Sequence, residues 1–168
     1  MKKILTIIGS TGLGKTDLAI KIAKKINGEI IGLDSRQIYK YMQIGTAQPS
    51  EAELRDVPHH LIGSRDPWQS ISAGDYAKMV FEKVCEIKGR NRLPIICGGA
   101  GLYYMAITKG IFSNSYSDSE LREKLEMQYD DNPNFLFDKL QAIDPEYGNI
   151  VHINNKKRLI RALEIFEL

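Results

Sequence analysis

The residues best suited to chemistry in this 168-residue chain form one glycine-rich run near its amino terminus. The run reads Gly9-Ser10-Thr11-Gly12-Leu13-Gly14-Lys15-Thr16 and fits the pattern G-x-x-x-x-G-K-[ST] in full. Its glycines allow backbone N–H groups to face an anion, Lys15 brings charge to the terminal phosphates, and the Thr16 hydroxyl can ligate Mg²⁺. The run therefore predicts a phosphate-binding loop for a di- or triphosphate such as ATP, with Mg²⁺ as cofactor. An ordinary glycine-rich turn between a strand and a helix is the alternative.

The loop does not identify the bond that breaks, because kinases, hydrolases and transferases with a pyrophosphate leaving group all use it. Kinases and hydrolases of this class often place an acidic residue at the end of another strand to help hold Mg²⁺. Here the corresponding apolar run ends in Cys97-Gly98-Gly99, without an acid. The lack of an acidic residue at the end of this run disfavours an ATPase.

Asp34 is the second candidate for chemistry, because it stands where a short apolar run ends. In open α/β sheets, ligands bind at the carboxyl ends of the strands, where the phosphate-binding loop also lies. A carboxylate there can act as a general base, and Ser35, Arg36 and Gln37 add a hydroxyl, a guanidinium and an amide beside it. Asp34 would equally suit the N-cap of a helix, and that alternative stays open.

Hydrophobic periodicity indicates the elements that would position these residues. We expect strands over residues 3–8, 29–33 and 93–97, and helices over 16–26, from Ser72 and from Leu102. A strand, a helix and a second strand within about 30 residues predict a β-α-β unit and hence a parallel sheet. The expected fold class is α/β, with a P-loop NTPase-like parallel sheet flanked by helices and a small helical insertion. Residues 44–71 are expected to form a long loop with short elements.

The composition predicts three parts of the chain: a P-loop α/β core over residues 1–112, a helical insertion over 113–150, and a helix over 151–168 that returns to the core. The last segment places Lys157, Arg158 and Arg161 on one helical face. Taken alone, such a basic face is most often a solvated surface.

The overall composition excludes several classes of protein. The net charge of +2 is too small to identify a nucleic-acid binder by charge alone. The two cysteines, Cys85 and Cys97, give no disulfide framework, so a reducing cytoplasm is expected. No apolar run approaches the roughly 18–20 residues that cross a bilayer, so no membrane association is expected.

Five further motifs follow the phosphate-binding loop in a characteristic order. They are Asp34-Ser35-Arg36-Gln37-Ile38-Tyr39, Ile44-Gly45-Thr46-Ala47, Pro58-His59-His60-Leu61-Ile62, Gly98-Gly99-Ala100-Gly101-Leu102-Tyr103 and Arg161-Ala162-Leu163-Glu164. In this order they resemble the tRNA dimethylallyltransferases, also called tRNA isopentenylpyrophosphate transferases. The resemblance covers nearly the whole chain.

The resemblance implies transfer of a dimethylallyl group from dimethylallyl diphosphate to N6 of the adenosine immediately 3′ of a tRNA anticodon. Asp34 would be the catalytic base near N6. Lys15, Thr16 with its Mg²⁺, and the loop amides would neutralise the pyrophosphate as it leaves.

The resemblance also implies contacts with the tRNA anticodon loop. Asp34, Ser35, Arg36 and Gln37 would contact the adenosine flipped out of that loop. Ala100, Arg122, Lys157, Arg158 and Arg161 match further tRNA-binding positions, and the insertion over 113–150 would face the tRNA. Four residues depart from the family pattern: Ala100 stands for threonine, Ile153 for proline, Asn155 for aspartate and Lys157 for glutamine. A monomer is expected.

The family's chain normally continues well past the segment matched by Arg161-Ala162-Leu163-Glu164, whereas this sequence stops at Leu168. The resemblance therefore implies a form that lacks the C-terminal part, with activity impaired by truncation. Two alternatives remain open: a small-metabolite P-loop kinase, and a truncated nucleotide- or RNA-binding module without turnover.

Overall fold

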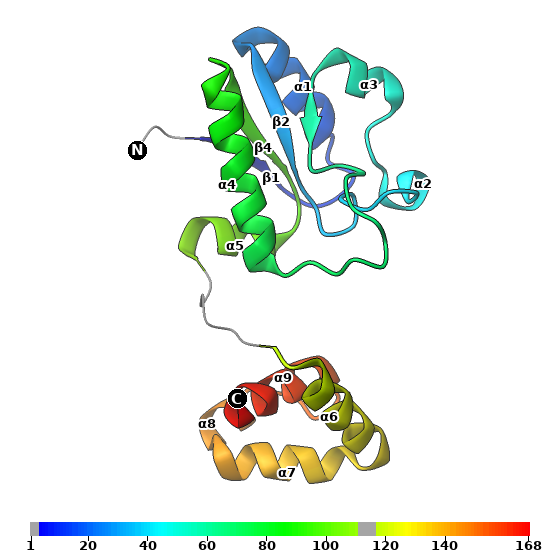
Figure 1. The fold of residues 1–168 in the computed structure, drawn as a ribbon, viewed down its shortest axis with the longest axis vertical. Helices are drawn as coiled ribbons and strands as arrows, with labels where there is room; N and C mark the ends of the chain where they lie inside the picture. The colour runs from blue at the N-terminus through cyan, green and yellow to red at the C-terminus, as the bar shows by residue number, and fades with distance from the viewer. Residues whose placement is uncertain (1–3, 111–116) are drawn as a thin grey trace. The chain divides into compact units, whose positions relative to one another are not determined.

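The computed structural model describes residues 4–110 and 117–168, and the chain divides into two compact units, Met1–Ile111 and Phe112–Leu168. The elements of the first unit are β1 (Leu5–Ile8), α1 (Lys15–Ile26), β2 (Gly28–Leu33), α2 (Gln43–Thr46), α3 (Glu51–Asp56), β3 (His59–His60), α4 (Ala73–Gly89), β4 (Leu93–Gly98) and α5 (Gly101–Lys109) (Figure 1). Those of the second are α6 (Ser119–Asp131), α7 (Pro133–Ile143), α8 (Pro145–Gly148) and α9 (Lys156–Glu167). Across these two ranges, no helix has both the length and the apolar character needed to cross a membrane.

The first unit is built on a parallel sheet of four strands in the order β1-β4-β2-β3. The prediction of an α/β fold with a parallel sheet is therefore confirmed. The third strand along the chain, β3, lies inside the segment that the sequence predicts to be a loop with short elements. It pairs His59 with Ile30 and His60 with Ile31, and two residues are too few to show the alternation that marks a strand.

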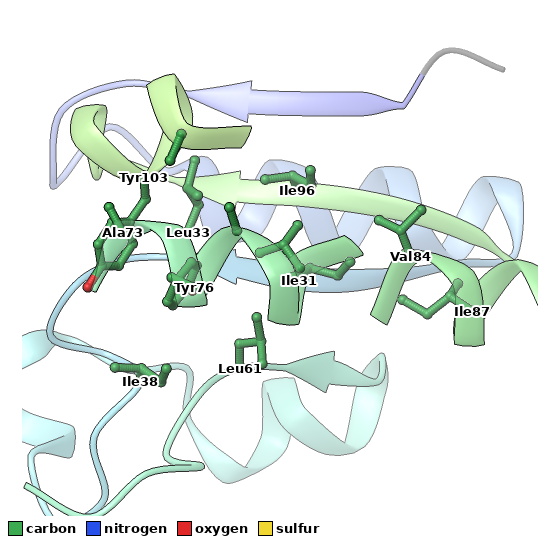
Figure 2. Close-up of a cluster of buried hydrophobic side chains, with 13 residues drawn as sticks. Ile31, Leu33, Ile38, Leu61, Ala73, Tyr76, Val84, Ile87, Ile96 and Tyr103 are labelled. Carbon is green, nitrogen blue, oxygen red and sulfur yellow. The ribbon is translucent and has the colours of Figure 1, made fainter. Parts of the chain in front are cut away.

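Helices cover both faces of this sheet, because the side chains of each strand alternate between its faces. Ile31, Leu33 and Ile96 pack with the buried residues of α4 and α5, as Figure 2 shows. Ile30 and Ile95 point the other way and pack with the buried residues of α1. Because hydrophobic core covers both faces of the sheet, a ligand-binding site is expected at the carboxyl ends of the strands.

At that end, the backbones of β2 and β4 approach each other closely. The N–H groups of Gly99 and Ala100 both donate to the carbonyl oxygen of Leu33, at 3.0 and 3.1 Å. A Cβ atom on Gly98 would overlap the Leu33 carbonyl, and one on Gly99 would lie 3.0 Å from the carbonyl oxygen of Gly9. A residue without a side chain is required at Gly98, and Gly99 would tolerate a Cβ only if the Gly9 carbonyl moved slightly.

The second unit is a small helical assembly around its own hydrophobic core. That core contains Leu125, Leu136, Leu140, Val151, Leu159, Ile160 and Leu163. Residues 151–168 thus share a core with α6 and α7, and the expectation that this helix returns to the α/β core stays a prediction. The apolar stripe of α9 shows that the helix must pack, but periodicity does not show which helices it packs against.

A buried carboxylate links α9 to the start of α6 in this second unit. Glu164 of α9 has no exposed surface, and its oxygens accept hydrogen bonds from Arg122 at 2.8 Å and Arg161 at 2.6 Å. The backbone N–H of Asp118 also donates to it, at 3.0 Å. Burial alone would raise the pKa of Glu164, but the hydrogen bonds from Arg122, Arg161 and Asp118 outweigh it and hold the pKa below its usual value.

The close approach of β4 to β2 predicts that Gly98→Ala is strongly destabilising. Its methyl group would meet backbone atoms that cannot move without disturbing the sheet, so we expect a loss of at least about 2 kcal/mol in the free energy of unfolding. Urea denaturation measures this loss. The matched control is Gly89→Ala at the end of α4, where a Cβ would meet nothing within 4 Å and stability should be unchanged or slightly higher. Equal losses in the two variants would contradict this account.

The charge cluster around Glu164 predicts a specific dependence of stability on pH. Because its folded-state pKa is depressed, the ionised carboxylate adds stability above its usual pKa of 4.5, and this is lost as the pH falls through the lower folded value. Glu164→Gln should therefore cost about 2 kcal/mol at pH 7, since Arg122 and Arg161 remain partly exposed, and the difference from the parent chain should shrink below about pH 4.5.

Unfolding curves between pH 3 and pH 7 measure that difference, with the exposed Glu123→Gln as control. A difference that stays constant over this range would show that Glu164 does not act through its charge.

Candidate functional site

A cavity of about 230 Å³ opens at the carboxyl end of the sheet, where the phosphate-binding loop, the end of β2 and the end of β4 meet. Its lining residues are Thr11, Gly12, Gly14, Lys15, Thr16, Asp17, Asp34, Gln37, Ala47, Cys97, Gly98 and Gly99. The structure thus brings the loop together with Asp34, which lies 18 positions beyond its last residue, Thr16. One cavity can therefore hold a phosphorylated ligand beside a carboxylate.

The loop takes its shape from two glycines with left-handed backbone angles, Gly12 at φ 86° and Gly14 at φ 70°. Gly14 is the N-cap of α1 and supplies no side chain to its first N–H groups, so these groups and the helix dipole remain available to an anion. Lys15 begins the helix, and its Nζ donates to the carbonyl oxygen of Ser10 at 2.5 Å. The ammonium group is thereby kept folded over the loop.

Three residues of the loop lie outside the cavity lining. Gly9 links the loop to the sheet through its N–H, which donates to the carbonyl oxygen of Gly98 at 3.4 Å. Ser10 holds Lys15 by its backbone oxygen, and the side chain of Leu13 is 70% exposed. These residues shape the loop, while the other five face the cavity.

Asp34 uses one carboxylate oxygen to organise the turn after β2. Its Oδ1 accepts the N–H of Arg36 at 2.8 Å and the N–H of Gln37 at 3.2 Å. No helix begins there, so the side chain closes a turn and does not cap a helix. The second oxygen, Oδ2, accepts no hydrogen bond from residues 4–110 or 117–168, which leaves it available to a ligand in the cavity.

The residues after Asp34 differ in their placement. Ser35 and Arg36 are exposed and do not line the cavity, whereas Gln37 does. The side-chain Nε2 of Gln37 donates to the carbonyl oxygens of Thr46 at 3.0 Å and Ala47 at 2.9 Å. Gln37 therefore joins the turn after β2 to the segment that follows α2.

Five lining residues were not singled out as site residues from the sequence: Asp17, Ala47, Cys97, Gly98 and Gly99. Cys97 lies near the carboxyl end of β4, where ligands bind in open α/β sheets, so the argument that identifies Asp34 could also have identified Cys97. Its Sγ donates to the carbonyl oxygen of Lys15 at 3.6 Å. Burial raises the pKa of the Cys97 thiol, so the group facing the phosphate loop is uncharged at neutral pH. Ala47 ends the motif Ile44-Gly45-Thr46-Ala47, which contributes to the family resemblance but does not by itself assign Ala47 to a site.

The cavity suits a hydrated divalent cation only together with a phosphorylated ligand. The described parts of the chain contain no group of three or more His, Cys, Asp or Glu side chains that could hold a metal ion. The Thr16 hydroxyl lines the cavity beside Asp17 and Asp34. Mg²⁺ commonly takes one or two protein ligands and completes its octahedron with phosphate oxygens and water, so this donor set fits Mg²⁺.

The second unit has a cavity of its own, with a volume of about 530 Å³ and a largely cationic lining. It is lined by Arg122, Glu126, Lys156, Lys157, Ile160 and Arg161. Three of the residues that the resemblance assigns to tRNA thus gather in one place, and Arg122 and Arg161 are oriented by Glu164. The N-cap residue of α9, Asn155, accepts the N–H of Arg158 at 3.3 Å, which is the same capping role that aspartate would fill.

Two other residues assigned to tRNA lie outside that cavity. Arg158 is exposed on α9, and Ala100 belongs to the first unit, where it is the N-cap of α5 without a side-chain hydrogen bond. The N–H of Ala100 is committed to Leu33. Its carbonyl oxygen accepts the N–H of Tyr104 at 2.9 Å, so a ligand would meet this residue mainly through its methyl group.

Comparisons with known proteins agree with each other. The curated tRNA dimethylallyltransferases of Thermodesulfovibrio yellowstonii and Bacillus subtilis are each 45% identical to this chain, over 98% and 96% of its length and 52% of their own. The chain thus spans about half the length of the curated relatives it matches.

Solved structures give the same result. A full-length tRNA isopentenylpyrophosphate transferase from Bacillus halodurans matches all of this chain and 56% of its own, with 40% identity and a TM-score of 0.65. A eukaryotic dimethylallyltransferase described as acting on tRNA matches 99% of this chain and 42% of its own, with 29% identity and a TM-score of 0.81.

The family model for IPP transferase matches residues 37–168, which is most of the chain. A parallel sheet, a phosphate-binding loop facing a carboxylate, and relatives at 45% identity point to one group of proteins. This chain belongs to the IPP transferase family.

Proposed function

We propose that this chain carries the donor-diphosphate site and the acceptor base of a tRNA dimethylallyltransferase. The reaction moves a dimethylallyl group from dimethylallyl diphosphate to N6 of the adenosine 3′ of the anticodon in tRNA. The observation that supports the proposal is that Lys15, Thr16 and Asp34 line the same cavity. The names of the relatives, which are tRNA dimethylallyltransferases and transferases acting on tRNA, support it.

The phosphate-binding loop binds the diphosphate of the donor. Charge develops on the bridging oxygen as the bond from C1 of the dimethylallyl group to that oxygen breaks, and pyrophosphate leaves. The open N–H groups at the start of α1 and the ammonium of Lys15 lie where they stabilise this charge. Mg²⁺ held by the Thr16 hydroxyl and the phosphate oxygens would supply further neutralisation of the leaving group.

Asp34 accepts the proton of the nucleophile. The lone pair of an exocyclic adenine amine is delocalised into the ring, so N6 attacks C1 efficiently only when its proton can be removed as the C–N bond forms. Oδ1 is occupied by the turn, and Oδ2 takes the proton. The products are N6-dimethylallyladenosine, pyrophosphate and a protonated carboxyl group that returns its proton to water.

The cationic residues of the second unit bind the phosphate backbone of the tRNA. Arg122, Lys157 and Arg161 line one cavity and Arg158 is exposed on the same helix as Lys157, which is an arrangement typical of phosphate contacts. Such contacts position an RNA without reading its sequence. The affinity falls as the salt concentration rises, because the release of counterions from the RNA then contributes less to binding. The identity of the target base is then left to the turn that contains Asp34.

Substitution of Asp34 tests the assignment of the base. Asp34→Asn keeps an oxygen that can accept from the N–H groups of Arg36 and Gln37, so the turn should persist while the base is lost. We expect transfer of labelled dimethylallyl groups to unmodified tRNA, in the presence of Mg²⁺, to fall at least about 100-fold. Pyrophosphate affinity, measured by calorimetry, should stay within about twofold. Undiminished transfer by Asp34→Asn would exclude Asp34 as the base, and no transfer by the parent chain would reject the transferase activity for these 168 residues.

Substitution of Lys15 tests the diphosphate site separately. Lys15→Ala removes a charge-assisted hydrogen bond to the anion, so the dissociation constant of pyrophosphate should rise about tenfold or more. Lys21→Ala, on the exposed surface of the same helix, is the matched control and should bind like the parent chain. Equal affinities in all three proteins would place the diphosphate elsewhere.

A further inference from the structure

One wall of the phosphate-site cavity has almost no hydrophobic support. Ala47 forms this wall and follows α2 directly. The helix α2 has no buried residue, and the side chain of Ile44 within it is 99% exposed. A short segment of this kind does not keep its position by packing, so other interactions must hold it against the site.

Those interactions are a reciprocal pair of glutamine side chains. Nε2 of Gln37 donates to the carbonyl oxygens of Thr46 and Ala47, as described above. In the opposite direction, Nε2 of Gln48 donates to the carbonyl oxygen of Gln37 at 2.9 Å and to that of Tyr39 at 2.8 Å. Each glutamine thus uses both hydrogens of its amide to hold the backbone of the other segment; we call this pair the glutamine clasp.

We propose that Gln48, which does not line the cavity, is a positioning residue for the acceptor side of the site and acts through Gln37. It holds the backbone of Gln37, and Gln37 in turn holds the wall at Ala47. The same arrangement fixes what Gln37 can offer a ligand. With both amide hydrogens committed, its Oε1 is the polar side-chain atom left, and this oxygen can only accept a hydrogen bond.

This property suits an acceptor that presents an N–H group and disfavours one that presents a carbonyl oxygen at the same place. An amine nucleophile such as N6 of adenine meets this requirement. This part of the inference rests on the proposed function, whereas the role of Gln48 in holding the wall does not.

Three variants separate the hydrogen bonds of Gln48 from its size. Gln48→Met keeps the length of the side chain and removes both donations. Gln48→Lys restores donors at nearly the same reach. Gln43→Met is the matched control, because Gln43 lies in the same segment, is exposed and makes no side-chain hydrogen bond to the described residues.

The first measurement is amide hydrogen exchange of residues 37–48, followed by mass spectrometry on the full chain. Gln48→Met should exchange at least about tenfold faster in this segment, while Gln48→Lys and Gln43→Met stay within about twofold of the parent chain. The affinity for pyrophosphate and the urea midpoint should be unchanged in all three variants. Unchanged exchange in Gln48→Met would overturn the role of Gln48.

The second measurement is the Michaelis constant for each substrate in the transfer reaction. Gln48→Met should raise the KM for tRNA about tenfold and leave the KM for dimethylallyl diphosphate within about twofold, and Gln48→Lys should restore the first value. A parallel rise in both constants, or failure of Gln48→Lys to restore binding, would overturn the positioning role. If the parent chain shows no transfer, the proposed function fails, and hydrogen exchange alone decides whether the glutamine clasp holds the wall.

Discussion

The site depends on the contact between the carboxyl ends of β2 and β4, where backbone meets backbone. The Leu33 carbonyl accepts hydrogen bonds from two N–H groups of the turn after β4. The absence of a side chain at Gly98 allows the backbones of β2 and β4 to come into contact. Because the N–H of Gly9 donates to the carbonyl oxygen of Gly98 and Gly99 lies close to the Gly9 carbonyl, this contact also positions the start of the phosphate-binding loop. Asp34 follows Leu33 immediately, so the same contact fixes the position of the carboxylate relative to the glycine-rich loop.

Beyond that contact, the site is organised by hydrogen bonds from side chains to backbone, and hydrophobic packing contributes little. Asp34 shapes its own turn, and Gln37 and Gln48 join that turn to the segment after α2. Such bonds are exposed at least in part and are weaker than a packed core. This division of labour is common at binding sites, because a rigid sheet positions loops that can still adjust when a ligand enters.

The sequence predicts the parts of this arrangement that are local, and it does not predict those that depend on distant partners. The phosphate-binding loop follows from the spacing of Gly9, Gly14 and Lys15, and Asp34 follows from its place at the end of an apolar run. The strand order β1-β4-β2-β3 does not follow, since periodicity gives each strand without its neighbour. Gln48 has no distinguishing pattern around it, and the partner of α9 is likewise decided by tertiary packing.

The buried carboxylate of Glu164 couples the positions of two partly exposed cations, Arg122 and Arg161, to the folding of the helical unit. Arg122 and Arg161 both donate to this carboxylate, so the placement of each guanidinium depends on the same acid. Loss of either arginine would leave an undercompensated charge in a core of leucines. Replacement of one arginine is therefore expected to be tolerated only when the acid is also replaced, or when another cation of the fold takes its place.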